Sequence, residues 1–453
     1  MKKLLLINPP QKHTIEGNLP KYVDEARGNI PPLGLLYTAA AVETNRQDWE
    51  VRLVDMSVGQ QLDGAKPDLV GITATTFTLI DTLMVAKLVK DRWNVPVVLG
   101  GIHPTIYPNE TADLPNIDCA FAGESEETFP QAIDAIASGQ AKVVKGMVTE
   151  VVALPLPAYH LLDASCYYSV IGKNARLTSM FTSRGCPYNC IFCHRETMGR
   201  KFRARTAEQV VNEVGCAVSL LGIKEVLFYD DTFTVDKRRV EDICRGIIYR
   251  KRIQSLPEKL CFDIRARVDT IDAELLGWLK RAGCKRIHYG VEASSNQMLR
   301  ILRKGITIEQ VRKAFYLTKQ QGIEILAYFI IGSPSETREE ILGTIRLAKE
   351  LKPDYCHFAI MTPYPATPLY NVGLQGGRYK DYWLEFATTP REDWCVPYWP
   401  ELTRGELLEL LDRAYREFYW RPGYIMKEVV KTRSLKQLSK KGKSALRILV
   451  EHK

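Results

Sequence analysis

The chain has 453 residues, of which 45% are hydrophobic and 25% charged, and its formal net charge is +9. This composition excludes a fibrous or disordered chain, and the length predicts two or three domains. No run approaches the roughly 20 apolar residues of a membrane helix, and the first apolar run stops at Asn8, too early for a secretory signal. The eleven cysteines lack paired spacing, so we expect a cytoplasmic protein without a disulfide framework.

The first 140 residues alternate strand-like and helix-like segments, which is typical of a doubly wound parallel α/β sheet. Strands are expected at KKLLLIN, VRLVDM, PDLVGIT, VPVVLG and DCAFAG. The loops that follow four of them are polar or rich in glycine, namely residues 8–10, 73–76, 100–104 and 123–124. In open α/β sheets a ligand binds at the carboxyl ends of the strands. Composition alone therefore indicates a nucleotide-sized ligand at this edge.

A connector and a second alternating region follow. The prolines of LPLPAYHLLD disfavour a helix over residues 141–176. Six strand–helix units are then expected over 177–370, with strands near 178–183, 225–230, 260–265, 285–291, 324–331 and 355–361. Their polar motifs also fall where the strands end, which predicts a second site at carboxyl ends of strands.

The loop after the first of these strands contains Cys186, Cys190 and Cys193 in a C-x3-C-x2-C array. Three thiolates bind three corners of a [4Fe–4S] cluster and leave one iron open, whereas ferredoxin-type carriers supply four cysteines per cluster. The alternative is a zinc knuckle, which needs a fourth Cys or His at a regular spacing. His194 adjoins Cys193 and is badly placed to complete a tetrahedron with it, so the sequence favours the open cluster.

This spacing, with Phe192 before the last cysteine, resembles the radical S-adenosylmethionine (SAM) superfamily. INPP, PPLGLLY, VGITATT, GGIHPT and AGESEET, in this order, resemble the cobalamin-binding domain that precedes many radical SAM barrels. The resemblance implies a Rossmann-like cobalamin domain over 1–140, a linker over 141–176, a partial (β/α)6 barrel over 177–370 and a helical, aromatic and basic segment over 371–453. It also implies cobalamin contacts by Asn8, Pro9, Leu33, Thr73, Thr75, Gly100, Gly101, His103, Gly123 and Glu124.

The second strand departs from the cobalamin-domain pattern. Domains that bind cobalt through histidine carry D-x-H-x-x-G, but here Ser57 stands two residues after Asp55 and Gly59 comes one place early. The resemblance therefore implies cobalamin without a histidine lower ligand. The alternative is a flavodoxin-like domain with no cofactor.

For the barrel, the resemblance implies SAM contacts by Phe192, Arg267, Glu292, Ser294 and Gly332. A guanidinium fork suits the methionine carboxylate, although Arg267 alternatively forms a structural ion pair with Asp269. Glu292 and Ser294 are expected at the ribose or amino group, and Gly332 is expected to let the backbone approach adenine. Substrate contacts are expected from Asp230, whose alternative role is to cap a helix, and from Tyr364.

The expected chemistry is radical formation from SAM, followed by transfer of a methyl group from methylcobalamin to an unactivated carbon. Two alternatives stay open: an oxidative cyclase that acts on a magnesium-porphyrin ester, and a cobalamin sensor without catalysis. We expect a small-molecule substrate, an external flavodoxin- or ferredoxin-like electron donor and no nucleic-acid partner.

The end of the chain leaves two further questions. The aromatic residues between 378 and 424 either line the substrate pocket or form the apolar face of a helical lid on the barrel. Residues 425–453 contain nine Lys or Arg against two Glu, a basic tail that is a weaker indication of contact with a membrane surface.

Overall fold

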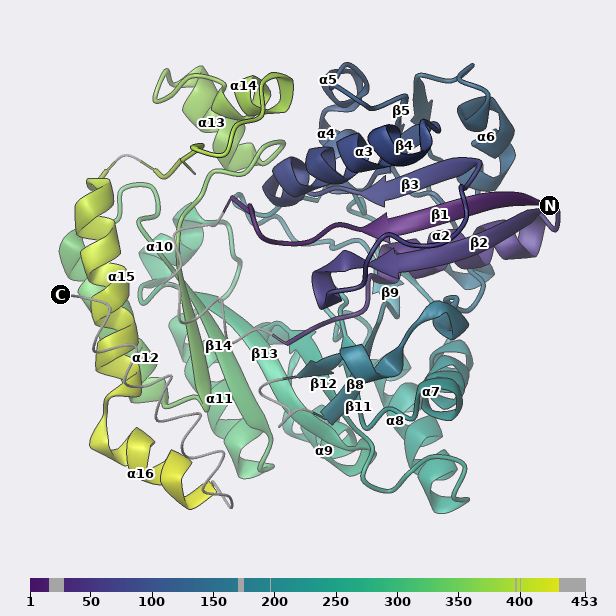
Figure 1. Ribbon diagram of the computed structural model, residues 1–453. Coiled ribbons are helices and arrows are strands. Elements are labelled where there is room, and N and C mark those ends of the chain that lie inside the picture. Colours follow the sequence, from purple (N-terminus) through teal and green to yellow (C-terminus); the bar gives the residue numbers. More distant parts are fainter. Residues whose placement is uncertain (16–27, 170–174, 196, 396, 400, 432–453) are drawn as a thin grey trace.

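The computed structural model describes residues 1–15, 28–169, 175–195, 197–395, 397–399 and 401–431 (Figure 1). The first domain is built on a sheet of six parallel strands in the order β2-β1-β3-β4-β5-β6. These strands are β1 (Lys2–Asn8), β2 (Trp49–Asp55), β3 (Leu69–Thr73), β4 (Val97–Gly100), β5 (Cys119–Ala122) and β6 (Val143–Lys145). The helices that connect them are α2 (Leu33–Asn45), α3 (Leu79–Trp93), α4 (Ile102–Ile106), α5 (Pro108–Ala112) and α6 (Thr128–Ala137). Since β6 lies beyond residue 140, the segment predicted as a linker begins with a strand of this sheet.

The apolar start of the chain is a central strand that is buried on both faces. Leu5 and Ile7 of β1 pack with α3 in one core, while Leu4 and Leu6 pack with α2 and α6 in another. Successive side chains of a strand point to opposite faces, so an uninterrupted apolar run fits a strand with helices on both sides. The strand order reverses direction between β1 and β3, and such a switch point opens a crevice for a ligand.

The second domain is a curled, open sheet in the order β15-β14-β13-β12-β11-β8-β7. Six of its strands are parallel and match the predicted ones: β8 (Ala175–Met180), β11 (Glu225–Phe228), β12 (Cys261–Ala266), β13 (Cys284–Glu292), β14 (Glu324–Ile331) and β15 (Tyr355–Ile360). The sequence reading missed β7 (Tyr168–Ser169), an antiparallel edge strand of two residues. The partial barrel is therefore confirmed, with one short strand added.

The outer face of this sheet is covered by α7 (Ala207–Leu221), α8 (Lys237–Arg252), α9 (Ala273–Ala282), α11 (Ile308–Gln320) and α12 (Arg338–Leu351) (Figure 1). The short helix α10 (Asn296–Ile301) follows β13 near the carboxyl ends of the strands. Side chains such as Thr206, Asp236 and Thr307 accept hydrogen bonds from the first turn of a helix, which stabilises each start.

The inner face of the barrel is polar. Phe262 and Ile264 of β12 belong to the core that packs against the helices, so Asp263 and Arg265 lie on the opposite face. Asp263 pairs with the buried Arg286 at 2.6 Å near the amino ends of the strands. This ion pair fills one end of the barrel and leaves the carboxyl ends for binding.

The C-terminal helices join both domains. They are α13 (Pro368–Gln375), α14 (Tyr382–Thr388), α15 (Arg404–Tyr419) and α16 (Pro422–Lys431). Tyr370, Trp383 and Phe386 are part of a core of the first domain, whereas α15 packs on β15 and α12 of the barrel. The aromatic residues of this region thus include core residues of both domains, and α15 lies on the barrel as the lid interpretation expected.

Two hydroxyl groups of α15 pair the free edge of β15. The hydroxyl of Tyr415 donates to the carbonyl of Phe358 at 3.0 Å and accepts from its N–H at 3.1 Å. The hydroxyl of Tyr419 makes the same two bonds with Cys356 at 2.7 and 3.0 Å. Backbone groups that an edge strand leaves open are satisfied here by side chains.

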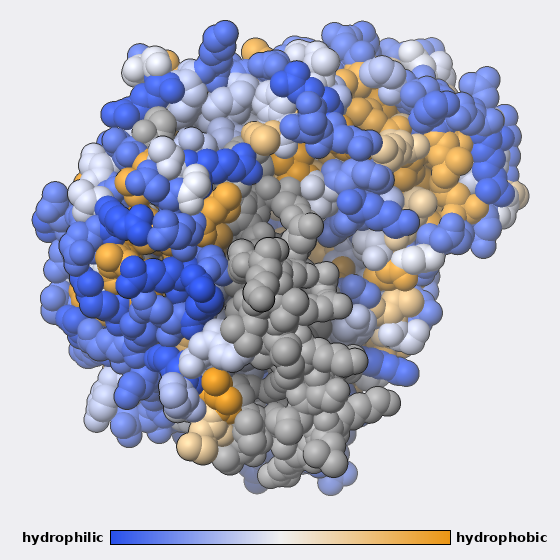
Figure 2. Space-filling model, turned by 60° about the vertical axis from the view of Figure 1, so that its left-hand side comes forward, coloured by the Kyte–Doolittle hydropathy of each residue, from blue (hydrophilic) through white to orange (hydrophobic). Residues whose placement is uncertain are grey.

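The described surface in Figure 2 is mostly hydrophilic, with apolar residues in separate patches. Within the described residues, no helix is long and apolar enough to cross a membrane. Most of the basic tail, residues 432–453, lies outside the described residues.

Candidate active site

The three predicted cluster cysteines lie in one loop, residues 185–202, between two short paired strands. These are β9 (Ser183–Arg184) and β10 (Arg203–Ala204). Gly185 begins the loop with a φ of +85°, and a Cβ there would overlap the carbonyl of Lys201, so this position requires glycine. The loop is tied to the barrel through Ile191, whose N–H donates to Leu302 at 3.1 Å and whose carbonyl accepts from Leu369 at 2.9 Å.

The thiols suit a shared metal cluster. Cys190 is buried and Cys186 and Cys193 are half-buried. Burial, together with the charges of Asp231, Cys190 and Cys186, raises the pKa of Cys193 to about 12, so the thiols lie within electrostatic reach of one another. Iron must displace those protons when it binds. Among the described residues, no three His, Cys, Asp or Glu side chains converge on a single ion position. A cubic cluster needs no such point, since each thiolate binds a different iron.

Glu292 sits at a strained position beside the cysteine loop. Its φ is +69°, and the β13–β14 register shifts between Gly290 and Glu292. Its carboxylate pairs with the half-buried ammonium of Lys304 at 2.6 Å. A Cβ on Gly290 would overlap this carboxylate, so glycine leaves the space for the pair. Such strain is typical of functional positions.

Arg267 and Phe192 belong to the same neighbourhood. The guanidinium of Arg267 binds Asp269 through two bonds of 2.9 and 3.0 Å, donates to the carbonyl of Lys304 at 2.8 Å and lies 3.7 Å from the ring centroid of Tyr188. The ammonium of Lys304 is 6.0 Å from the centroid of Phe192. The ion pair that was the alternative for Arg267 is present, and SAM binding by Arg267, Glu292 and Phe192 stays a prediction.

Two further predicted SAM residues face helices. The hydroxyl of Ser294 lies 3.4 Å from the carbonyl of Glu340 at the start of α12. Gly332 has a φ of +76°, and a Cβ there would lie 2.7 Å from a methyl group of Leu407 in α15. In this structure the glycine therefore admits the side chain of a helix.

The substrate contact of Asp230 stays a prediction, and the structure shows what its carboxylate binds within the protein. Its carboxylate is fully buried and accepts hydrogen bonds from Thr182 N–H at 2.6 Å, from the Thr182 hydroxyl and from the Ser183 hydroxyl at 2.7 Å. Helix α8 is capped by Asp236 instead. Asp230 thus holds the two residues that lead into the cysteine loop.

Tyr364 lies at the junction of the two domains. Its ring meets Phe77 of the first domain edge-on at 5.6 Å, and 36% of the residue is exposed. This position is compatible with the predicted substrate contact.

At the carboxyl edge of the first sheet, a closed hydrogen-bond network occupies the place of the missing histidine. The carboxylate of Asp55 accepts from the Ser57 hydroxyl at 2.6 Å, from the Asn8 amide at 2.8 Å and from the Tyr167 hydroxyl at 2.9 Å. Ser57 and Asn8 are therefore held by the domain itself. Tyr167 comes from the predicted linker and was missed by the sequence reading, because nothing local marks its distant partner.

The neighbouring loops present backbone rather than charged side chains. The hydroxyl of Thr75 caps a short 3-10 helix over 76–78 by accepting from Thr78 N–H. Gly101 has a φ of +107°, and a Cβ there would lie 2.7 Å from the carbonyl of Ala74 and 3.1 Å from the Thr73 hydroxyl. A Cβ on Gly100 would meet only open space. We call the backbone at Gly100 and Gly101 the glycine edge. It fits a large ligand that approaches the backbone closely.

Pro9 and Leu33 are both buried. Leu33 begins α2 and packs in the core of the barrel.

The structure assigns His103 to the interior. Its ring is fully buried, its Nδ1 lies 3.1 Å from the Thr76 hydroxyl, and burial lowers its pKa to about 3. This neutral, enclosed imidazole supports the turn, its Nε2 has no hydrogen-bond partner, and the cobalamin contact of His103 stays a prediction.

Glu124 is also used within the protein. Its carboxylate pairs with Arg184 at 3.0 Å and with Arg203 across the domain boundary. Burial acts to raise the pKa of Glu124, but Arg203 and Arg184 hold it below its usual value. Glu124 thus forms an interdomain ion pair, and its cobalamin contact stays a prediction, as does that of the neighbouring Gly123, which has a φ of +98°. Sequence reasoning missed both arginines, whose only signal is that they flank the cysteine loop.

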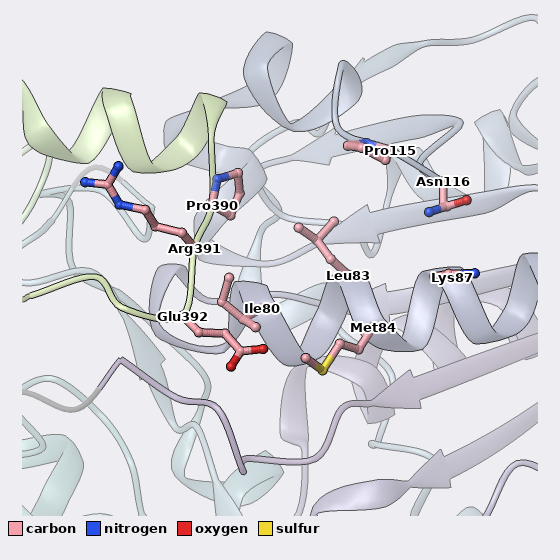
Figure 3. A pocket seen from close by; sticks show the side chains of 9 residues that line it. All are labelled: Ile80, Leu83, Met84, Lys87, Pro115, Asn116, Pro390, Arg391 and Glu392. Carbon is pink, nitrogen blue, oxygen red and sulfur yellow. The ribbon is translucent and has the colours of Figure 1, made fainter.

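A surface pocket of about 330 Å³ lies elsewhere, between α3, residues 115–116 and residues 390–392 (Figure 3). It is lined by Ile80, Leu83, Met84, Lys87, Pro115, Asn116, Pro390, Arg391 and Glu392. None of the predicted cofactor residues lines it, so it is separate from the site described above.

The fold and the site define a class of α/β enzyme in which a three-cysteine loop at the mouth of a partial barrel meets the ligand edge of a Rossmann-like domain. Residues 180–348 match the radical SAM superfamily, and residues 20–133 match the B12 binding domain. An uncharacterized methyltransferase of Pyrococcus horikoshii is 33% identical over 94% of this chain and 94% of its own length. The chain belongs to the radical SAM superfamily, in the group with an N-terminal B12-binding domain.

Two other similarities agree with this assignment. The anaerobic magnesium-protoporphyrin IX monomethyl ester cyclase of Rubrivivax gelatinosus is 28% identical over 88% of this chain and 76% of the relative. The cobalamin-dependent SAM radical enzyme OxsB, solved with aqua-cobalamin and SAM bound, shares the fold with a TM-score of 0.72 and 18% identity, over 97% of this chain and 70% of OxsB. The predicted family, fold class and cofactors, namely a [4Fe–4S] cluster, SAM and cobalamin, are confirmed.

Proposed function

We propose that the protein is a cobalamin-dependent radical SAM methyltransferase that methylates an unactivated carbon of a small molecule. The observation that carries the proposal is the direct docking of the cysteine loop on the carboxyl edge of the first domain, through Glu124, Arg184 and Arg203. The relative of highest identity reported above carries the name methyltransferase.

When bound, the cofactors supply the chemistry: the reduced cluster cleaves SAM to a radical that abstracts hydrogen, and methylcobalamin provides the methyl group. The chain's own task is to hold these groups in one water-poor space. Cys186, Cys190 and Cys193 would bind three irons, while Glu292 and Arg267 would orient SAM.

The glycine edge of the first domain would hold the cobalamin. Residues 100–101 and Gly123 present backbone to the ligand, and Ser57 is already bonded to Asp55, so we propose that no histidine binds cobalt from below. We propose an external flavodoxin- or ferredoxin-like protein as the electron donor.

The test is anaerobic reconstitution with iron, sulfide and hydroxocobalamin, followed by addition of SAM, a reductant and a small-molecule cell extract as the source of the methyl acceptor. Methyl transfer requires that SAM yields both 5′-deoxyadenosine and S-adenosylhomocysteine, the latter as methylcobalamin forms. A product that gains one CH2 unit supports the proposal. A product that gains oxygen, with no S-adenosylhomocysteine, would replace it with the cyclase reaction that the Rubrivivax relative is named for.

A further inference from the structure

Four charged side chains are enclosed between the two domains. Arg184, Arg203, Glu124 and Glu126 are each 7% exposed or less. Arg184 pairs with Glu124 at 3.0 Å and also with Glu126, and Arg203 pairs with Glu124 through two bonds. We call these four residues the interdomain ion cluster. Its charges balance, which is what permits their burial.

The two arginines form the base of the cysteine loop. Arg184 lies opposite Arg203 in the β9–β10 ladder, and Arg184 is two residues before Cys186. Each strand of this hairpin has two residues, and a hairpin of that size is not stable without further packing. The hairpin is therefore anchored on one side by Asp230 of the barrel and on the other by the carboxylates of the first domain.

The carboxylate side is equally fixed. Glu124 accepts from the N–H of Thr149 at 3.0 Å, and a Cβ on Gly146 would overlap its carbonyl, so glycine allows the backbones to meet. The preceding Gly123 donates its N–H to the Thr105 hydroxyl at 3.0 Å. One short turn thus places Gly123 at the carboxyl edge of the sheet, with Gly100 and Gly101, and places Glu124 against the hairpin.

We propose that the interdomain ion cluster couples the two cofactor sites, with Glu124 and Arg203 as positioning residues. The hairpin has two states. It is docked with all four charges paired, or undocked with all four charges in water. A partly docked hairpin is disfavoured because it would leave a buried charge without a partner. Cobalamin at Gly123 and iron on the cysteines each favour the docked state. By thermodynamic linkage, each cofactor then tightens the binding of the other by the same factor. This inference rests on the cobalamin edge proposed above.

The experiment measures the dissociation constant of hydroxocobalamin, by absorbance titration, for the full chain with and without the reconstituted cluster. For the unaltered protein we expect the cluster to tighten cobalamin binding at least tenfold, equivalent to about 1.4 kcal/mol. In Glu124→Gln, which keeps the side-chain volume but removes the charge, we expect the two constants to agree within twofold. The reciprocal measurement is iron release to a chelator, which cobalamin should slow in the unaltered protein and not in Glu124→Gln.

Matched variants separate coupling from general damage. Asp113→Asn removes the exposed pair with Lys142 in the same domain and should keep the full coupling. Glu126→Gln removes one of the pairs and should give an intermediate factor, which also serves if Glu124→Gln does not fold.

Three results would overturn an assignment. Equal cobalamin affinity with and without the cluster in the unaltered protein refutes the coupling but leaves the cobalamin site intact. Full coupling in Glu124→Gln refutes the role of the ion cluster. Absence of cobalamin binding in both forms refutes the proposed function of the first domain.

Discussion

The buried carboxyl of Glu336 gives the barrel a stability that depends on pH. Glu336 follows β14, is 2% exposed, and accepts a hydrogen bond from the N–H of Ser333 at 2.9 Å, while its Oε1 has no partner. Burial raises its pKa from 4.5 to about 7. The charged form is therefore disfavoured in the folded state.

The sign and size of the effect follow from linkage. Between pH 4.5 and 7 the folded state holds a proton that the unfolded state has released, so stability is full below pH 4.5 and is lost as the pH rises through 7. At about 1.4 kcal/mol per pKa unit, the loss amounts to about 3 kcal/mol. Glu336→Gln cannot ionise and should not show this loss.

The assay is urea unfolding of the apoprotein from pH 5 to pH 8.5. The difference in unfolding free energy between Glu336→Gln and the unaltered protein should grow in favour of the variant by about 2–3 kcal/mol as the pH rises. Glu339→Gln, which removes an exposed carboxylate from the first turn of the neighbouring helix α12, reports the general effect of charge. A difference that stays constant with pH, or grows to the same extent in Glu339→Gln, would refute the reasoning.

Five other substitutions, with two control variants, probe the site and its supports. Replacing any one of the three cluster cysteines by alanine should abolish cluster absorbance and reduce SAM cleavage to background, in Cys186→Ala, Cys190→Ala and Cys193→Ala alike. The control Cys216→Ala, on α7, should change neither property. If one of the three variants keeps full SAM cleavage, the cysteine replaced in it is not a ligand. Asp230→Ala should lower the unfolding free energy by about 3 kcal/mol, because it leaves the Thr182 N–H and two hydroxyls unpaired. An unchanged thermal melt would refute this structural role. Gly332→Ala should destabilise the fold by about 1–3 kcal/mol, because Gly332 has a positive φ and lies close to Leu407. Gly277→Ala, inside α9 with open space around it, should be neutral or stabilising. Equal melting temperatures for the two variants would contradict this expectation.

The sequence pattern predicted those strands and loops that depend mainly on residues close together in the chain. The apolar run at Leu4 to Ile7 and the six barrel strands follow from the alternation of strand-like and helix-like segments, and the cysteine spacing alone located the cluster loop. In each case the interacting residues are close in sequence, or the order of the strands determines which of them lie side by side.

Partner choice over long sequence distances was not predictable. Asp230 and Glu124 both lie at strand ends, where catalytic and cofactor-binding groups gather, but each is bonded to residues 47 to 79 positions away. Only the fold reveals that these carboxylates support the cysteine loop from its two sides. His103 is a similar case. Its motif predicted a cobalamin contact, whereas its burial against Thr76 could be recognised only in the fold.

The entry of Tyr370, Trp383 and Phe386 into a core of the first domain has a consequence for biosynthesis. Translation runs from the N-terminus, so the sheet of β1 to β6 leaves the ribosome more than 200 residues before the aromatic side chains that complete its packing. This domain therefore completes its packing only after α14 has been synthesised. A fragment that stops at residue 150 would expose the apolar surface that these three rings cover.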